Sequence, residues 1–267
     1  MLSELPNLVL LAALLLVTVG TVAAVEPLTD PTAAEQLKQL NDQTIIATRV
    51  LLDSEWDQFK NGANEATWSL ATLWGWRVSE SQDWGLRLKL PLVYARRDDD
   101  IAGLGDLEVG TGTAFRLNKT WRTAAGLELH VDTASDPTLG DRVWRLKPVW
   151  GVAHDITDWL TVNFNVDYSH SIAEEHKVAP QRYLELSLPA IFILPYDWSI
   201  SGKYEAKVDF ENGDHWTHIV NVGVAKRLSK LPLVLSATLE KSLDGGPKQF
   251  QANFTIVYFF ERYHVPK

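Results

Sequence analysis

Residues 84–94 read WGLRLKLPLVY, and apolar side chains occupy every even position from Trp84 to Tyr94. Arg87 and Lys89 occupy odd positions between them. A β-strand points successive side chains to opposite faces, so this stretch predicts a strand with one apolar and one charged face. An Arg or Lys that faces lipid at mid-depth costs about 2–4 kcal/mol. The apolar face is therefore predicted to meet lipid and the charged face to line a lumen.

Four tryptophans repeat this pattern at a nearly constant period. Trp84, Trp121, Trp159 and Trp198 are separated by 37, 38 and 39 residues, and each follows a short polar turn and opens an alternating stretch. Amphipathic rings at the same end of every second strand are what a membrane interface requires. We therefore predict that these four residues form the membrane-interface girdle of a transmembrane β-barrel, with one hairpin per period.

Twelve segments of the chain alternate in this way, and single-chain bacterial barrels have an even number of strands. The predicted strands are Thr44–Leu52, Thr67–Val78, Trp84–Ala95, Leu104–Leu117, Trp121–Thr133, Val143–His154, Trp159–Ile172, Arg182–Leu194, Trp198–Phe210, Trp216–Leu228, Leu233–Ser242 and Gln249–Phe260. The predicted fold is all-β, a transmembrane antiparallel up-and-down β-barrel of about 12 strands. Short turns are expected in the periplasm and longer loops, such as Asp53–Ala66, outside. A soluble β-sandwich is disfavoured because its tryptophans would not mark every second strand.

The remainder of the chain divides into three short parts. Residues 1–24 are predicted to be a signal peptide that ends at Val22-Ala23-Ala24, although Glu4 stands where a positive charge is expected. An inner-membrane anchor is the alternative. Residues 25–43 are predicted to form a periplasmic N-terminal segment with a short helix, either as a lead-in or as a plug. The barrel is expected over residues 44–260, and residues 261–267 form a C-terminal tail.

Charge and composition narrow the function. The 267 residues include eleven Trp and no Cys, and the formal net charge of −9 argues against nucleic-acid binding. In strands three to eleven the inward face carries nine acidic and nine basic side chains, a balance that argues against a strongly ion-selective pore. The residues predicted to line the lumen or its constriction are Arg87, Lys89, Asp106, Glu108, Glu128, His130, Asp132, Arg145, Lys147, Asp167, Glu185, Lys203, Glu205 and Lys207.

Within this set, four carboxylates are expected to gather on two neighbouring strands between basic residues: Asp106, Glu108, Glu128 and Asp132. They either form a constriction that orients polar solutes or neutralise charges that must lie inside anyway, because partly buried charges are usually paired. The sequence leaves both interpretations open.

Catalysis is not expected. Ser169-His170-Ser171 is the candidate nucleophile–base pair, but neighbouring residues of a strand point to opposite faces and no third orienting residue is evident. We therefore predict no enzyme activity, no catalytic residues, no metal site and no cofactor. Asp98, Asp99 and Asp100 could bridge to lipopolysaccharide through divalent ions, although a solvated loop is the simpler interpretation.

The stretch LKLPLVY (residues 88–94), followed by GLGDLEVG (residues 103–110), resembles the outer-membrane family labelled "MetA-pathway of phenol degradation". Gly103, Gly105 and Asp106 match the family motif. The resemblance implies a barrel that passes small molecules, aromatic and other hydrophobic compounds among them. The chain departs from a common barrel ending, because it continues past Phe259-Phe260 through residues 261–267.

The sequence thus predicts a channel or transporter in the outer membrane of a Gram-negative cell, for passive uptake of small organic molecules. The expected partners are membrane lipids and lipopolysaccharide, the barrel-assembly machinery and a small-molecule solute, without nucleic acid. The alternatives are an outer-membrane barrel enzyme that acts on lipid, and a closed structural or surface-interaction barrel.

Overall fold

The computed structural model describes residues 31–96, 100–175, 178–228, 231–244, 248–260 and 263–264. These residues contain one helix, α2 (Pro31–Lys38), and fourteen strands. The strands are β1 (Arg49–Phe59), β2 (Asn64–Ser79), β3 (Gln82–Arg96), β4 (Asp100–Leu104), β5 (Leu107–Arg116), β6 (Trp121–Val131), β7 (Val143–Thr157), β8 (Leu160–Glu174), β9 (Arg182–Leu194), β10 (Trp198–Asp209), β11 (His215–Leu228), β12 (Leu233–Asp244), β13 (Lys248–Phe259) and β14 (Tyr263–His264). The predicted signal peptide lies outside the described residues.

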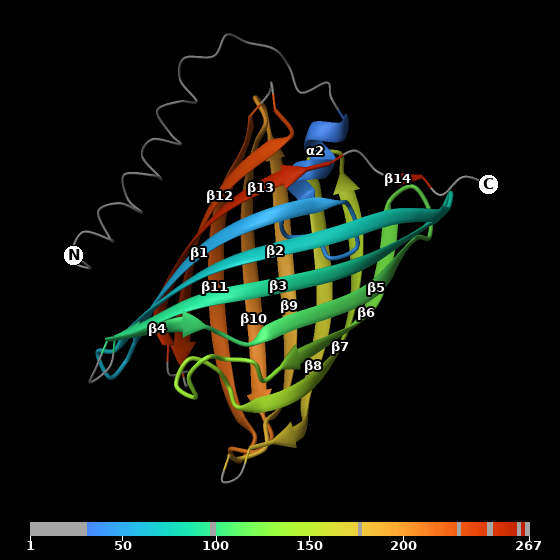
Figure 1. Cartoon of the computed structure of the whole chain (residues 1–267). Coiled ribbons are helices and arrows are strands. Elements are labelled where there is room, and N and C mark those ends of the chain that lie inside the picture. The colour runs from blue at the N-terminus through green and yellow to red at the C-terminus, as the bar shows by residue number, and fades with distance from the viewer. Residues whose placement is uncertain are drawn as a thin grey trace.

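Twelve of these strands form a closed antiparallel barrel (Figure 1). Each pairs with its neighbours in sequence, and β13 returns to pair with β1 from Arg49↔Phe259 to Phe59↔Lys248. β4 and β5 share one barrel position, because β5 pairs with the first part of β3 and β4 pairs with its last residues. The predicted up-and-down barrel is confirmed, and the chain closes without a free long edge.

Alternation along each strand assigns its two faces as the sequence predicts. In β3, Leu88 and Leu92 point outward and are 37% and 48% exposed, whereas Arg87 and Lys89 pair with charges inside. The outward face of the neighbouring β2 carries Trp68, which is also exposed. The barrel therefore presents an apolar belt outward and a polar wall to its lumen.

One end of the barrel carries the short connections, and the four predicted girdle tryptophans lie there. We call it the short-turn end and the opposite one the long-loop end. Trp84 donates its indole N–H to Thr111 Oγ1 over 3.0 Å, and Trp121 stacks on His154 with 4.2 Å between ring centroids. In outer-membrane barrels, short connections of this kind are typical of the periplasmic end.

The first predicted loop, Asp53–Ala66, is wrong. β1 continues to Phe59 and β2 starts at Asn64, so residues 60–63 make the turn, with Gly62 at a φ of 86° that favours glycine. Asp53, Glu55 and Asp57 alternate with outward-facing residues in a paired strand. Three carboxylates close together in sequence are common in solvated loops, but here they occupy the lumen-facing side of a strand.

The first predicted strand also starts too early, since β1 begins at Arg49 instead of Thr44. The residues before it lie on the inner wall, where Gly75 and Gly85 face each other across β2 and β3. A Cβ atom on either glycine would come within 2.9 Å of Ile46 Cγ2. The two glycines thus make room for the N-terminal segment inside the barrel.

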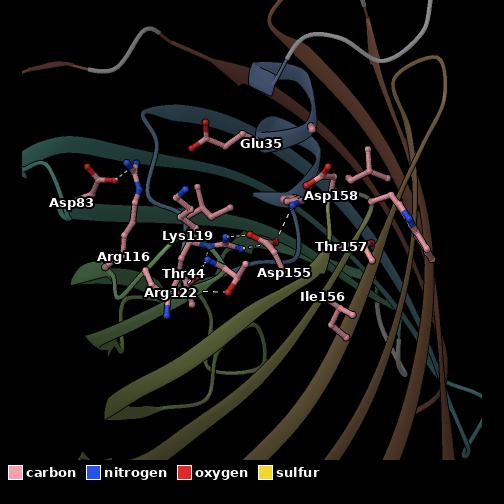
Figure 2. Close-up of a pocket in the computed structure, with 18 of the residues that line it drawn as sticks. Glu35, Thr44, Asp83, Arg116, Lys119, Arg122, Asp155, Ile156, Thr157 and Asp158 are labelled. Atoms are coloured by element: carbon pink, nitrogen blue, oxygen red, sulfur yellow. Dashed lines mark hydrogen bonds and ion pairs between the residues drawn. The ribbon is translucent and has the colours of Figure 1, made fainter.

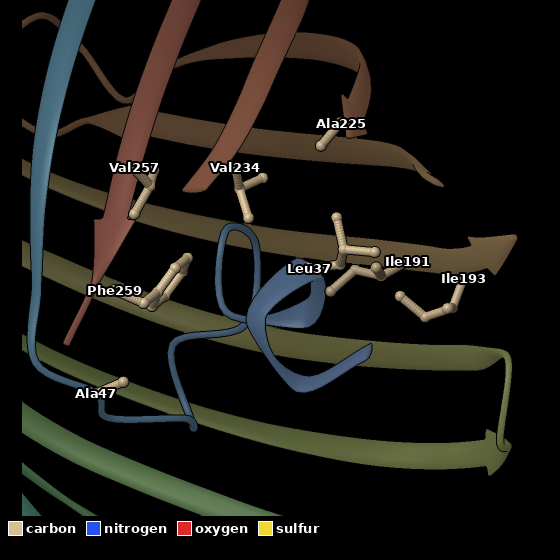
Figure 3. Close-up of a cluster of buried hydrophobic side chains, with 8 residues drawn as sticks. All are labelled: Leu37, Ala47, Ile191, Ile193, Ala225, Val234, Val257 and Phe259. Atoms are coloured by element: carbon tan, nitrogen blue, oxygen red, sulfur yellow. The ribbon is translucent and has the colours of Figure 1, made fainter. Parts of the chain in front are cut away.

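Helix α2 occupies the lumen at the short-turn end, as Figures 1 and 3 show. Leu37 is fully buried in an apolar cluster with inward-facing residues of four strands. The cluster consists of Leu37, Ala47, Ile191, Ile193, Ala225, Val234, Val257 and Phe259. We call α2 and residues 39–48 the plug. Burial of the leucine side chain stabilises the docked helix by roughly 1.5–3 kcal/mol.

The end of the described chain returns to the same mouth. β14 pairs in parallel with β2 through Tyr263↔Trp76 and His264↔Arg77. It covers the stretch of β2 that extends beyond the start of β1 and protects that edge from foreign strands. Within the described residues, no helix combines the length and apolar character needed to cross a membrane.

Candidate functional site

The lumen is the candidate site, and one side of it carries a continuous set of ion pairs. Lys89 Nζ lies 3.0 Å from Glu108 Oε1, and Arg87 Nη1 lies 3.1 Å from Glu108 Oε2 and 3.0 Å from Glu128 Oε1. Lys147 Nζ lies 3.4 Å from Glu128 Oε2. We call these five residues the charged ladder. The strand register places Lys89 opposite Glu108 and Glu128 opposite Lys147, so the pairs follow directly from sheet geometry.

The ladder continues toward the long-loop end through two predicted site residues, His130 and Arg145. Arg145 donates to Gln181 Oε1 over 2.6 Å and lies 2.6 Å from Asp141 Oδ2. Its second guanidinium nitrogen is 3.3 Å from His130 Nδ1. Arg145 thus ties the lumen wall to the loops above β6 and β8.

Asp106 and Asp132 lie apart from the ladder, contrary to the expected grouping with Glu108 and Glu128. Asp106 sits between β4 and β5, and its carboxylate accepts the backbone N–H groups of Thr133 (3.1 Å), Ala134 (3.1 Å) and Asp141 (2.7 Å). Asp132 follows β6 in the loop, where partial burial and then the neighbouring Asp106 carboxylate raise its pKa. Neither residue lies in a strand. Asp106 falls in the gap between β4 and β5, and Asp132 is the first residue after β6.

That loop, residues 132–142, folds against the inner wall, and we call it the inner loop. Leu139 is 6% exposed and packs on Val93 and Ala95, which share the lumen face of β3 with Lys89. A Cβ atom at Gly103 would lie 2.1 Å from Ser135 Oγ, and one at Gly105 would lie 2.9 Å from Val93 Cγ2. Gly103 and Gly105 therefore leave space for the inner loop in the long-loop mouth, and Asp106 binds its backbone N–H groups. Leu139, an isolated apolar residue in a polar loop, was the signal for this contact.

Strands β9, β10, β1 and β13 complete the charged region. Lys203 Nζ lies 2.7 Å from Glu205 Oε2, and Lys207 Nζ lies 3.7 Å from the centre of the Tyr183 ring. On β1, Asp57 pairs with Lys248 over 2.6 Å, and Lys248 also lies 3.4 Å from Glu55. The β1 carboxylates were missed because their segment was predicted as a loop.

These additions alter the charge balance of the lumen. From the level of Arg87 to the long-loop end, the described inner wall carries the carboxylates of Asp53, Glu55, Asp57, Glu65, Glu108, Glu128, Asp167, Glu185, Glu205, Asp209 and Glu240, and the cations Arg49, Arg87, Lys89, Arg145, Lys147, Lys203, Lys207 and Lys248. Acidic groups outnumber basic ones. This part of the lumen should therefore attract cations more than the sequence count predicts.

The opposite side of the lumen, from β8 to β13, carries amides and hydroxyls between its charged side chains. These polar residues include Asn163, Asn165, Ser169, Ser171, Ser187, Ser199, Ser201, Asn221, Ser236, Thr238, Asn253 and Thr255. We call this side the amide–hydroxyl wall. The sequence contained a signal, since these residues share the parity of the inward charges on their own strands. Uncharged polar residues are, however, also common in loops and on surfaces.

At the short-turn end, polar contacts hold the plug in place. Lys38 Nζ lies 2.9 Å from Asp155 Oδ1, and Arg122 bridges Asp155 to Asp42, whose Oδ2 is 2.9 Å from Arg122 Nη2. Figure 2 shows Arg122 between Thr44 and Asp155. On the far side, Arg227 Nε donates to Gln36 Oε1 over 2.7 Å. Removal of one partner from such a partly buried salt bridge destabilises the protein, because the remaining charge is left without compensation.

Cavities lie on both sides of the plug. Between α2 and the turns of β5–β6 and β7–β8 is a cavity of about 1080 Å³ (Figure 2). Beyond the plug, a cavity of about 470 Å³ separates it from the charged ladder, with Gly85, Gly110 and Gly151 among its lining residues. Small residues thus leave space in the middle of the lumen, and the plug separates this space from the short-turn mouth.

The candidate nucleophile–base pair of β8 does not assemble in the structure. Ser169 is fully buried on the lumen face of β8, whereas His170 lies exposed on the outer face and stacks near Tyr168. Asp98 and Asp99 lie outside the described residues, and Asp100 is exposed at the start of β4. Among the described residues, no three His, Asp or Glu side chains are placed to share a metal ion.

No family model and no curated protein matches the chain, but solved structures share its fold. An outer membrane channel from Pseudomonas putida F1 has a TM-score of 0.65 at 15% identity, over 81% of this chain and 96% of that one. The NanC porin has a TM-score of 0.57 at 13% identity, over 80% and 100% of the two chains. The KdgM porin has a TM-score of 0.51 at 12% identity, over 79% and 99%. The chain therefore has the fold of outer-membrane porins and channels.

Proposed function

We propose that this protein is an outer-membrane channel of a Gram-negative bacterium for passive uptake of small organic solutes. The observation that carries the proposal is a closed barrel whose lumen is polar from the long-loop mouth to the plug. A barrel that served as a structural element alone would gain nothing from cavities in its interior, because packed apolar side chains would stabilise it more. The porin-like fold supports this function.

The lumen favours solutes with polar groups. Between the plug and the inner loop, its wall consists mainly of charged, amide, hydroxyl and glycine residues, and its larger apolar residues lie chiefly under α2 and Leu139. A purely hydrophobic molecule would lose water without gaining contacts there. An aromatic compound that carries a charged or hydrogen-bonding group fits this lumen better. Membership in the family labelled "MetA-pathway of phenol degradation" belongs to the same proposal, supported by the structural role of Gly103, Gly105 and Asp106.

Passage requires the plug to shift, because α2 fills the mouth between β9 and β13. Its contacts are of two kinds, the apolar cluster around Leu37 and the polar anchors at Asp155, Arg122 and Arg227. Both sets of contacts are noncovalent, so they can break while the plug stays attached to β1 through the chain. We propose that the plug undocks into the periplasm and thereby joins the central cavity to the short-turn mouth.

The test is conductance of the purified full chain in planar bilayers, beside the Leu37→Ala variant, which weakens docking of the plug. We expect brief openings in the first protein and longer ones in the second. Liposome swelling with small sugars and amino acids then tests passage of organic solutes. If both proteins insert but pass neither ions nor solutes, the channel is rejected in favour of a closed structural barrel. Release of fatty acid from lipid vesicles would instead favour the enzyme.

A further inference from the structure

A carboxylate on β9 stands at a junction within the lumen. Glu185 lines the cavity of about 590 Å³ at the long-loop end, together with Glu205 and Lys207. It also lines the next cavity, of about 360 Å³, together with Asn165 and Lys203. A solute that moves from the first cavity to the second therefore passes this side chain.

Two more carboxylates flank Glu185 on the adjacent strands. Asp167 is its direct partner across β8 and β9, and Glu205 lies opposite Ser187, two residues along β9. We call Asp167, Glu185 and Glu205 the neck. Three like charges on neighbouring strands repel one another, so this arrangement costs stability unless a cation lies nearby.

The nearby lysines leave Glu185 without a partner. Lys207 is its register partner across β9 and β10, but the ammonium group lies over the Tyr183 ring. Lys203 pairs with Glu205. Lys147 lies 3.4 Å from Asp167 and is shared with the charged ladder. Among the described residues, Glu185 makes no hydrogen bond or ion pair, and the neck keeps an excess of negative charge.

A second, independent feature lies beside the neck on the lumen face of β8. Asn163 Oδ1, Asn165 Oδ1 and Asp167 Oδ1 are buried oxygens without a hydrogen-bond partner in the described structure, and the three residues are 1%, 3% and 7% exposed. Asn165 already donates its Nδ2 to Ser187 Oγ over 3.2 Å, so an acceptor is what remains. Residues two apart in a strand lie about 6.6 Å from each other. The row therefore offers acceptors at regular intervals along the path.

We propose that the neck and this row recognise an organic cation that donates N–H hydrogen bonds, such as a primary ammonium group on a small polar solute. The proposal rests on the channel function. Negative charge at the neck attracts the cation, and the oxygens of Asp167 and Asn165 accept its N–H bonds. The spread of acceptors along a strand suits an extended organic ion, since a compact metal ion requires ligands converging on one point.

Two isomeric cations separate charge from hydrogen bonding. n-Butylammonium and tetramethylammonium have the same composition and charge, but the second has no N–H donor. Reversal potentials of the full chain in planar bilayers, under bi-ionic conditions, give their permeability ratio. Butylammonium is more slender, so the informative quantity is the change of this ratio between proteins. We expect Asp167→Asn with Glu185→Gln to lower the ratio of butylammonium to tetramethylammonium at least fivefold, and Glu185→Gln alone to lower it about half as far on a logarithmic scale.

The matched control is Glu55→Gln with Asp57→Asn. It removes two carboxylates from the same lumen, but these are already paired with Lys248. We expect this control to keep the ratio within twofold. Glu185→Gln breaks no ion pair of the described wall, so its folding, measured as the heat-dependent shift on gels, should match that of the parent. An unchanged ratio in both neck variants, or an equal fall in the control, would overturn the site.

Calorimetric titration of n-butylammonium into the full chain in detergent distinguishes failure of the site from failure of the channel. Binding that Glu185→Gln weakens at least fivefold, without current in any protein, would retain the site and reject the channel. Current without a change of ratio and without such binding would retain the channel and reject the site. Absence of both binding and current would reject both proposals.

Discussion

The two sides of the inner wall use the same strand geometry but satisfy their polar groups differently. In the charged ladder, carboxylates and cations meet across β3, β5, β6 and β7, within 3.4 Å of each other. On β8, Asn165 of the amide–hydroxyl wall and the neighbouring Asp167 each retain one acceptor oxygen without a partner among the described residues. Charge inside a barrel therefore does not by itself mark a solute site. The paired side reinforces the wall, and the incompletely paired side has groups to offer to a solute.

The largest expected effect tests whether the ladder reinforces the wall. Glu108→Leu removes the carboxylate shared by Arg87 and Lys89. We expect it to lower the free energy of unfolding by about 3 kcal/mol, because Lys89 loses its carboxylate partner and Arg87 keeps only Glu128. Urea unfolding of the refolded protein in detergent measures this. A loss below about 1 kcal/mol would show that the ladder is hydrated and contributes little, as exposed pairs do.

A pair of adjacent substitutions in β3 compares the inner wall with the lipid face. Leu88→Arg places a charge in lipid and should cost about 2–4 kcal/mol. Lys89→Leu should cost less, because Glu108 keeps Arg87 as a partner at 3.1 Å. The measurement is the yield of folded barrel in lipid vesicles. Equal tolerance of both changes would contradict the assigned register.

The plug gives an intermediate effect. Leu37→Ala should weaken docking of α2 by about 2 kcal/mol, which raises the undocked population roughly 30-fold. The chain has no Cys, so Ala33→Cys, at a fully buried position of α2, supplies a single thiol. Its rate of labelling by a maleimide should rise in the Leu37→Ala background. A Leu239→Ala control on the outer face should not change it, and equal rates in all three proteins would refute docking through Leu37.

The smallest effect is expected on the amide–hydroxyl wall. Ser201→Ala removes a lumen-facing hydroxyl for which the structure shows no hydrogen bond, and the free energy of unfolding should change by less than about 0.5 kcal/mol. The same urea measurement applies. A loss close to that of Glu108→Leu would remove the distinction between the two sides of the lumen.

The alternation of apolar and polar side chains predicted the barrel, because each strand must present one face to lipid and the other to water. This constraint is already visible in the sequence of β3. Alternation also placed Glu108, Glu128 and Lys147 on the inner face, because each alternates with outward-facing apolar residues of its own strand. The same rule, applied to Asp53, Glu55 and Asp57, would have extended the first strand. Clustered charges also occur in solvated loops, so these carboxylates alone do not distinguish a loop from the lumen face of a strand.

Other features depend on contacts that no local pattern contains. Asp106 reads as a strand residue until the inner loop supplies three N–H groups to its carboxylate. The plug is held by Lys38 and Asp155, which are 117 residues apart, and by Gln36 and Arg227, which are 191 apart. The free acceptors at Asn163 and Asn165 depend on the hydrogen bonds that β8 makes with its neighbours in the described structure. These features follow from the closed barrel.

The contacts of α2 also impose an order on folding. The helix precedes β1 in the chain, yet its apolar face packs on β9, β11, β12 and β13, near the other terminus. That surface is complete once the last strand has paired with the first. Contacts of such sequence separation form late, because loop-closure entropy opposes them. Burial of Leu37 should therefore report the final event of barrel assembly, and a barrel stalled before closure would leave its N-terminal segment open to proteases.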